Sequence, residues 1–240
     1  MRSVAAVSVG GAPGVTTVLC AAAAATGEEQ PLLVVEATPS GGTIAARWRL
    51  NVRDTVTTTA KLAMDLAGRV DLWDVAHRPW LGSSRVIPAH PSAVVMRQAQ
   101  VGQWLASRVP AVTRPVLVDA GRIDGTADQL ALLECVDVVW LVLEPIVEQV
   151  AAAKAAAPWL NRAGRVEVVV REPAGDPARD SASAVARALD WPAVATVPDD
   201  PASARALCGL SPPRRGLSRS PLLRTGRALA ERLTLTEVPA

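Results

Sequence analysis

Several residue types are scarce or absent in this sequence, and each scarcity removes a class of function. Phe and Tyr do not occur, and among 240 residues only two are Lys, two are His and three are Cys. The two histidines, His77 and His90, are too few for a histidine-rich metal centre or a histidine-based triad, so we expect them on loops or the surface. The three cysteines, Cys20, Cys135 and Cys208, are widely spaced. This spacing predicts small core side chains in a reducing compartment, not a disulfide framework or a zinc site.

Long apolar runs and a strong net charge are also missing. Lys+Arg 25 against Asp+Glu 23 gives a net charge of +2, which does not favour nucleic acid or an anionic membrane as the default partner. Gly10, Gly11, Pro13 and Gly14 interrupt the apolar N-terminal stretch, and the residue before Cys20 is Leu, so we predict neither a secretory nor a lipoprotein signal. No other run approaches the ~20 residues of a membrane span. We therefore expect a soluble, cytoplasmic chain without direct membrane insertion.

What the sequence does contain is a regular alternation of short β-branched runs with Ala- and Leu-rich amphipathic segments. Strands are predicted over residues 3–9, 31–36, 114–119, 137–143, 165–171 and 193–197. Helices are predicted over residues 16–26, 42–49, 91–108, 126–135, 146–159, 179–189 and 220–233, with a short helix from residue 200. This order predicts a doubly wound, mostly parallel α/β sheet in one domain, residues 1–240. Within it, residues 50–89 are an irregular excursion with a short strand at 86–87, and residues 209–219 are a basic loop.

The first predicted strand leads into a glycine-rich turn, at the edge of the sheet where ligands of such folds bind. The turn consists of Gly10, Gly11, Ala12, Pro13, Gly14, Val15, Thr16 and Thr17. Its glycines let the backbone wrap an anion, and the N-terminus of the following helix attracts negative charge. The Thr16 hydroxyl occupies the place where a P-loop has its Mg²⁺ ligand. The same residues also suit a tight strand-to-helix turn with no ligand.

Taken with later segments, this turn resembles the MinD/ParA family of P-loop ATPases with a deviant Walker A motif. The matching segments are residues 33–42 (LVVEATPSGG), 116–121 (VLVDAG), 137–145, 197–201 and the last helix, 220–233. The resemblance spans nearly the whole chain in order, and is closest to small actinobacterial MinD-like proteins and to the CpaE/TadZ proteins of Tad-type pilus or secretion machinery. It implies a P-loop NTPase fold, ATP and Mg²⁺ as cofactors, and Thr16 and Asp119 as the Mg²⁺ ligands.

The chain departs from this family at the residues that hold and cleave phosphate. The family's two loop lysines fall on Gly10 and Val15, so the loop has lost its cation. The two aspartates that follow the family's second strand correspond to Glu36 and Thr38, so the carboxylate that would orient the attacking water is missing. Glu36 itself is expected to be a solvated carboxylate at the end of its strand.

Two further positions follow from the same comparison. The family's adenine-recognising Asn would fall near residues 171–173, where no Asn occurs. Arg122, which follows Asp119 closely, is expected to replace the lost lysines beside bound phosphates, because a guanidinium suits bidentate phosphate contact. Asp119 would serve catalysis only if the site is active, and otherwise caps the next turn.

These features predict a degenerate MinD/ParA-like pseudo-ATPase that positions or scaffolds a Tad-type pilus or secretion apparatus. ATP binding and hydrolysis would be weak or absent. The resemblance implies a second copy of the chain, and a secretion or pilus ATPase with its membrane platform, as partners. The alternatives are an active ATPase switch in chromosome or plasmid partition, and a DNA-binding module. The DNA would contact the basic residues Arg214, Arg215 and Arg219, which a solvated surface would equally explain.

Overall fold

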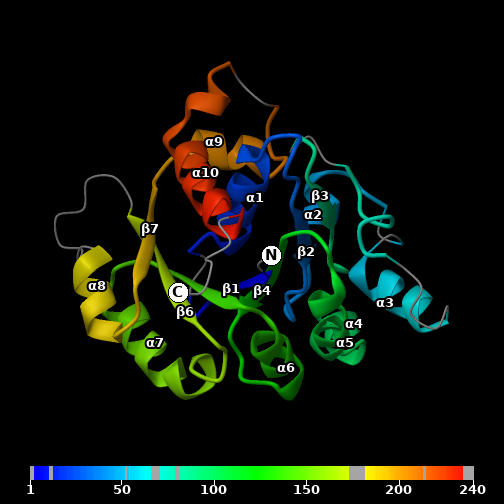
Figure 1. Cartoon of the computed structure of the whole chain (residues 1–240), viewed down its shortest axis with the longest axis horizontal. Helices are drawn as coiled ribbons and strands as arrows, with labels where there is room; N and C mark the ends of the chain where they lie inside the picture. The colour runs from blue at the N-terminus through cyan, green and yellow to red at the C-terminus, as the bar shows by residue number, and fades with distance from the viewer. Residues whose placement is uncertain are drawn as a thin grey trace.

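Within the described residues, a sheet of seven parallel strands forms the centre of the molecule (Figure 1). The computed structural model describes residues 3–10, 13–51, 53, 55–65, 71–78, 82–172, 182–212 and 215–234. The strands are β1 (Ser3–Ser8), β2 (Leu33–Glu36), β3 (Arg85–Ile87), β4 (Val116–Arg122), β5 (Val138–Leu143), β6 (Val166–Glu172) and β7 (Ala193–Pro198). Their order is β3-β2-β4-β1-β5-β6-β7, and every neighbouring pair is parallel. The predicted doubly wound α/β fold is confirmed.

Helices cover both faces of this sheet, which explains why its strands are almost continuously apolar. The helices are α1 (Val15–Ala25), α2 (Ile44–Arg47), α3 (Val56–Asp65), α4 (Ala93–Gln98), α5 (Val101–Arg108), α6 (Ala127–Cys135), α7 (Val147–Leu160), α8 (Ala182–Leu189), α9 (Pro201–Leu207) and α10 (Pro221–Thr234). In Figure 1, α1, α9 and α10 lie on one face, and α5, α6, α7 and α8 on the other. Alternate residues of β1 enter the two cores: Val4 and Ala6 pack with α1 and α10, and Ala5 and Val7 with α5, α6 and α7.

The last helix is built as its sequence predicts. Ser220 accepts a hydrogen bond from the backbone N–H of Leu223 (3.2 Å), which caps the helix that begins at Pro221. Its inner stripe is buried and packs on α1. Gly226 belongs to this stripe, and a Cβ there would come within 2.3 Å of the backbone oxygen of Ala21. The close approach of α10 to α1 therefore depends on a residue without a side chain.

The segment 91–108, expected as one helix, is two. α4 ends at Gln98, and Gln100 adopts a left-handed conformation with φ 47° before α5 begins. The N–H groups of Gly102 and Gln103, at the start of α5, donate to the carboxylate of Asp128 over 3.0 and 2.8 Å. Because Asp128 belongs to α6, the local sequence does not reveal the interaction that caps the second helix.

The excursion over residues 50–89 contributes α3 and the edge strand β3, which lies where the short strand was predicted. Two arginines, Arg85 and Arg114, stack on the ring of Trp73 at 4.5 and 4.4 Å from its centroid. These contacts join the excursion to the sheet. The predicted helix over 179–189 starts outside the described residues, and its described part is α8.

Candidate functional site

The glycine-rich turn lies between the end of β1 and the start of α1, at the carboxyl edge of the sheet. Gly14 precedes α1 with φ 94°, a conformation that favours glycine, and no side chain caps the helix there. The first N–H groups of α1 are thus left to bind an anion, as the phosphate-loop prediction requires. Gly10, Pro13, Val15, Thr16 and Thr17 are placed on this turn or the first turn of α1, whereas Gly11 and Ala12 lie outside the described residues.

The two residues predicted to hold Mg²⁺ lie in direct contact. Thr16 donates its hydroxyl hydrogen to the carboxylate of Asp119 over 2.6 Å. Asp119 lies in β4, is 2 % exposed, and also accepts the backbone N–H of Gly121 over 3.1 Å. Burial raises the pKa of Asp119 above its ordinary value, against the opposing effect of the Thr16 and Gly121 hydrogen bonds. This pair supplies two oxygen ligands of the kind that Mg²⁺ prefers.

Glu36 is not a solvated carboxylate, and that expectation was wrong. The residue is 1 % exposed. Its carboxylate accepts backbone N–H groups from Thr43 (2.8 Å), Ile44 (3.3 Å) and Ala89 (2.9 Å). It therefore joins the end of β2 to the start of α2 and to the segment after β3. Burial, and next the nearby charge of Asp119, raise the pKa of Glu36 to about 7.

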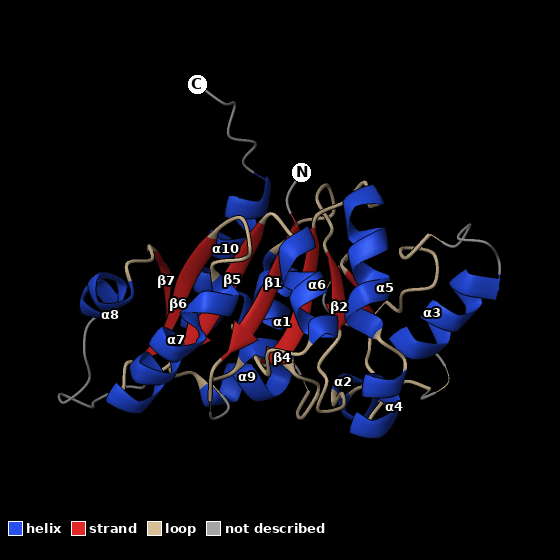
Figure 2. Cartoon of the chain, turned by 90° about the horizontal axis from the view of Figure 1, so that it is seen from below, coloured by secondary structure: helices blue, strands red, loops and turns tan. Residues whose placement is uncertain are grey.

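A cavity of about 280 Å³ opens beside the glycine-rich turn. Its walls come from segments far apart in the sequence: the turn and α1, the end of α2, the ends of β6 and β7, α9 and the start of α10. The lining residues are Pro13, Gly14, Thr17, Val18, Arg47, Arg171, Val197, Pro198, Asp199, Asp200, Pro201, Ala204, Arg205, Cys208, Leu210 and Leu222. Figure 2 shows α2 and α9 near the edge at which the strand arrows end. Asp200 caps α9 by accepting the N–H of Ser203 (3.1 Å), as its sequence predicts.

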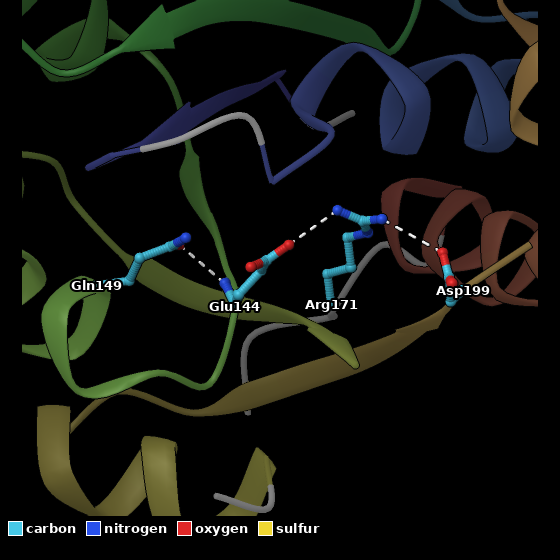
Figure 3. Close-up of polar contacts among 4 residues, drawn as sticks. All are labelled: Glu144, Gln149, Arg171 and Asp199. Carbon is cyan, nitrogen blue, oxygen red and sulfur yellow. Dashed lines mark hydrogen bonds and ion pairs between the residues drawn. The ribbon is translucent and has the colours of Figure 1, made fainter. Parts of the chain in front are cut away.

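Three arginines, Arg47, Arg171 and Arg205, line this cavity, and the sequence analysis assigned a site role to none of them. Arg171 forms ion pairs with Glu144 (2.8 Å) and Asp199 (3.3 Å), across the ends of three neighbouring strands (Figure 3). Its charge is therefore largely balanced. Because Arg171 is the last residue of a predicted strand, the sequence could have identified it as a candidate site residue. Arg47 is half-buried at the end of α2, and its positive charge acts to lower the pKa of both Asp119 and Cys208.

Arg122 does not line this cavity. It lines a separate hollow of about 390 Å³ with Pro39, Ser40, Arg97, Ile123 and Asp124. Arg122 follows Asp119 closely in sequence, but the left-handed Gly121 (φ 69°) separates the two, and the backbone of Arg122 pairs with Ser8 of β1. Of the two arginines, only Arg47 lines the cavity beside the turn. The role expected of Arg122 stays a prediction.

The remaining candidates are the two histidines and the basic residues of the loop before α10. His90 accepts the backbone N–H of Ser92 over 3.0 Å in the turn before α4, and the backbone of His77 pairs with Val86. Arg215 and Arg219 are exposed in the basic loop, whereas Arg214 lies outside the described residues. Among the residues that the structure describes, no three His, Cys, Asp or Glu side chains form a group suited to a metal ion. No helix in the described ranges is both long and apolar enough to cross a bilayer.

Comparison with known proteins identifies the fold. No protein-family model matches the chain, and no curated protein sequence does. Solved structures do match over almost its whole length. The septum site-determining protein MinD from Pyrococcus horikoshii, complexed with Mg-ADP, has a TM-score of 0.75 and 17% identity, with 97% of this chain and 95% of that chain covered.

Two further structures extend the likeness. A ParA family ATPase from Chlorobium tepidum has a TM-score of 0.73 and 17% identity, over 96% of this chain and 97% of the other. A complex of a McdA variant from Cyanothece with ATP has a TM-score of 0.72 and 13% identity, over 100% of this chain and 99% of the other. The chain therefore has the fold of the MinD, ParA and McdA ATPases.

Proposed function

We propose that this chain is a positioning or scaffolding factor whose cavity binds Mg·ATP weakly and does not hydrolyse it. At the finer level we propose a CpaE/TadZ-like role at a Tad-type pilus or secretion apparatus. One observation carries the proposal. A glycine-rich turn leads into α1 with a cavity beside it, but the turn carries no lysine, because Lys61 and Lys154 are the only two in the chain.

We attribute the weak binding to the loss of lysine from the turn. Gly14 and the first turn of α1 offer backbone N–H groups to a phosphate, and Thr17 lines the cavity. A lysine beside the β- and γ-phosphates would add a charge-assisted contact of about 1.5–3 kcal/mol. Its loss weakens affinity by roughly tenfold to a hundredfold. Arg47 compensates in part, because it adds a cation to the same cavity.

We attribute the absence of hydrolysis to the side chains of Glu36 and Thr38, at and after the end of β2. Hydrolysis requires a side chain that orients the attacking water. The carboxylate of Glu36 is buried and accepts three backbone N–H groups, so it is committed to the fold. Thr38 offers only a hydroxyl, which is hydrogen-bonded to that of Ser40 over 2.9 Å.

Thr16 and Asp119 fit Mg²⁺ by donor type, since a hydroxyl and a carboxylate are hard oxygen ligands. The ion would neutralise phosphate charge. Thr16 donates in its 2.6 Å hydrogen bond to Asp119, so the lone pairs of its oxygen remain available to coordinate the ion while Asp119 holds the hydroxyl in place.

The proposed partners are a second copy of the chain and a secretion or pilus ATPase with its membrane platform. We propose that the contact lies near the carboxyl edge of the sheet, where two apolar side chains are exposed. Leu210 lines the cavity and is 50% exposed, and Val147, at the start of α7 after β5, is 75% exposed.

Calorimetric titration with Mg·ATP, together with phosphate release, tests the nucleotide proposal. We expect weak binding and no release above the protein-free rate. Val15→Lys, which restores a cation at a family lysine position, should strengthen binding by about tenfold or more. Arg47→Gln should weaken it, Arg122→Gln tests the role expected of Arg122, and Arg187→Gln, exposed in α8 and not among the residues that line the cavity, is the matched arginine control. Tight binding with turnover by the unaltered chain would contradict the proposal.

Light scattering at increasing protein concentration, with and without Mg·ATP, tests self-association. Titration against a purified Tad-type secretion ATPase tests the finer role. Self-association without binding to that ATPase would contradict the pilus role and leave scaffolding intact. A chain that remains monomeric and binds no such ATPase would contradict both.

The partition alternative, with DNA as a partner, has one observation in its favour. Arg215, Arg219, Arg224 and Arg227 are all exposed on the basic loop and the outer side of α10. Such a row can neutralise backbone phosphates without sequence preference. Retention on duplex DNA that weakens steeply with salt, and is lost when Arg214, Arg215 and Arg219 are replaced together by Gln, would support this alternative. If the unaltered chain and the triple variant are retained equally, the basic loop does not account for DNA binding.

A further inference from the structure

Two of the three cysteines meet at the wall of the cavity, although they are 188 positions apart in the sequence. Cys20 lies in α1, one turn after Thr17, and Cys208 directly follows α9. Their thiols interact with each other, and Cys208 also contacts the hydroxyl of Thr17, with 3.4 Å between sulfur and oxygen. Both residues are buried, Cys20 completely and Cys208 with 3% of its surface exposed, and Cys208 is among the residues that line the cavity. The expectation that these cysteines only fill core space is therefore incomplete.

We propose that Cys20 and Cys208 form an oxidisable dithiol, in which Cys208 reacts first with a hydroperoxide and Cys20 then closes a disulfide. This inference concerns the thiols alone, and it holds whether or not the cavity binds a nucleotide. The bond would tie α1, next to the phosphate-binding turn, to the end of α9 on the opposite wall.

The surroundings of the two sulfurs indicate which thiol reacts first. Arg47 lies close enough to Cys208 to attract its thiolate, and the Thr17 hydroxyl can donate to that sulfur. The largest lowering effect comes from the hydrogen bond of the Cys20 thiol, and together with Thr17 and Arg47 it brings the pKa of Cys208 to about 6, against the effect of burial. The Cys208 thiolate is therefore populated at neutral pH on the atom that faces the cavity.

Cys20 has the opposite environment. Its interaction with Cys208, its complete burial, and the nearby charges of Asp119 and Glu36 all raise the pKa of the Cys20 thiol. It stays protonated and shielded until its neighbour is oxidised. Cys135 is the internal comparison, because it lies apart from this pair in α6 and burial raises its pKa to about 11.

Hydrogen peroxide oxidises the two thiols in two steps. The Cys208 thiolate attacks one oxygen of hydrogen peroxide, the O–O bond breaks, and the departing hydroxide takes a proton to become water, leaving a sulfenic acid. The sulfur of Cys20 then attacks the sulfur of Cys208, the S–O bond breaks, and the departing hydroxide takes the Cys20 proton as a second water. Two thiols lose two electrons in total, and one peroxide gains them.

The test is peptide mapping by mass spectrometry, without reductant, of the full chain after titration with hydrogen peroxide. We expect one cross-linked peptide pair that carries Cys20 and Cys208, a chain lighter by two hydrogen atoms, and an unmodified Cys135. Cys20→Ser should accumulate a sulfenic acid on Cys208 that dimedone traps. Cys208→Ser should leave Cys20 reduced, and Cys135→Ser, the matched control, should behave as the unaltered chain.

Several results would overturn the proposal in the unaltered chain, so it does not depend on any variant folding. These are oxidation of Cys135 before Cys208, conversion of Cys208 to a sulfinic acid without a cross-link, a disulfide between two chains, or no reaction. A rate measurement adds a second readout. Arg47→Gln should slow alkylation of Cys208 by iodoacetamide about three- to tenfold at neutral pH, and an unchanged rate would refute the role given to Arg47.

Discussion

The hydroxyl of Thr16 and the carboxylate of Asp119 are 2.6 Å apart and hydrogen-bonded, although 103 positions separate them in the sequence. The bond links the first turn of α1 to β4, which lies next to the central strand β1, and it joins the two residues predicted to hold Mg²⁺. Because Thr16 is the donor, its oxygen lone pairs remain available to Mg²⁺ while the bond is formed. The same edge also contains the buried Glu36, and because the turn carries no lysine, the cations that line the cavity beside it are Arg47, Arg171 and Arg205.

Asp119→Asn should lower the pKa of Glu36 from about 7 toward 4.5, because the Asp119 charge is the second-largest cause of its rise. The shift will be partial, since burial is the larger cause and remains. The measurement is an NMR pH titration of the glutamate side-chain carboxyl carbons. Asp74→Asn is the control, because Asp74 is exposed and lies in the excursion. A Glu36 pKa that moves equally in both variants would contradict the coupling.

Glu36 should make the chain less stable as the pH rises from 5 to 7.5. Its folded-state pKa of about 7 lies above the ordinary value of 4.5, so between these values the folded chain holds a proton that the unfolded chain has released. The stability from this group is fully present below pH 4.5 and is lost as the pH passes through about 7. The raised pKa of the buried Asp119 acts in the same direction.

Urea unfolding at the two pH values, for the unaltered chain and for Glu36→Gln, measures this effect. The decrease attributable to Glu36 should be on the order of 2 kcal/mol. Glu36→Gln should remove that part of the pH dependence. An identical pH dependence in the two proteins would show that Glu36 does not titrate in this range.

Gly226→Ala should destabilise the chain by about 1–3 kcal/mol, although alanine is the better helix former. The added methyl group would meet the backbone of Ala21 in α1, which cannot rotate away as a side chain can. The matched control is Ala228→Gly on the exposed side of the same helix, which should cost about 1 kcal/mol from helix propensity alone. Thermal unfolding of both variants checks the ranking, and a stabilised Gly226→Ala protein would contradict the packing described here.

Arg47→Gln should weaken Mg·ADP binding more than Arg171→Gln does. The charge of Arg171 is balanced by Glu144 and Asp199 (Figure 3). The charge of Arg47 instead acts on Asp119, beside the turn. Competition titrations with a fluorescent ADP analogue provide the comparison. A larger loss in Arg171→Gln would mean that a bound nucleotide displaces those ion pairs and uses Arg171 directly.

Much of the fold could be predicted because its signals are local. The apolar strands, the glycine-rich turn after β1, the Ser220 cap and the stripe of α10 all depend on residues near one another in the sequence. The break at Gln100 could not be predicted, since the carboxylate of Asp128 that caps α5 comes from another helix. The prediction that Glu36 is solvated was wrong for the same reason. Two of the N–H groups that donate to its carboxylate lie at the start of α2, and the third follows β3.

The candidate site was predicted less completely than the fold. The edge of the sheet and the pairing of Thr16 with Asp119 follow from the order of motifs. Arg47 was missed because α2 brings it to the cavity from a position that no strand end marks. Nearness in sequence, which suggested Arg122, did not place that residue in the cavity, because the chain turns at the left-handed Gly121.

Phosphorus NMR of the concentrated chain with Mg·ATP, followed over a day, tests weak binding without hydrolysis most directly, because one spectrum reports both properties. We expect shifted and broadened ATP resonances in fast exchange, with inorganic phosphate no higher than in a protein-free sample. Slowly exchanging bound resonances, or phosphate that accumulates with the protein concentration, would contradict the account.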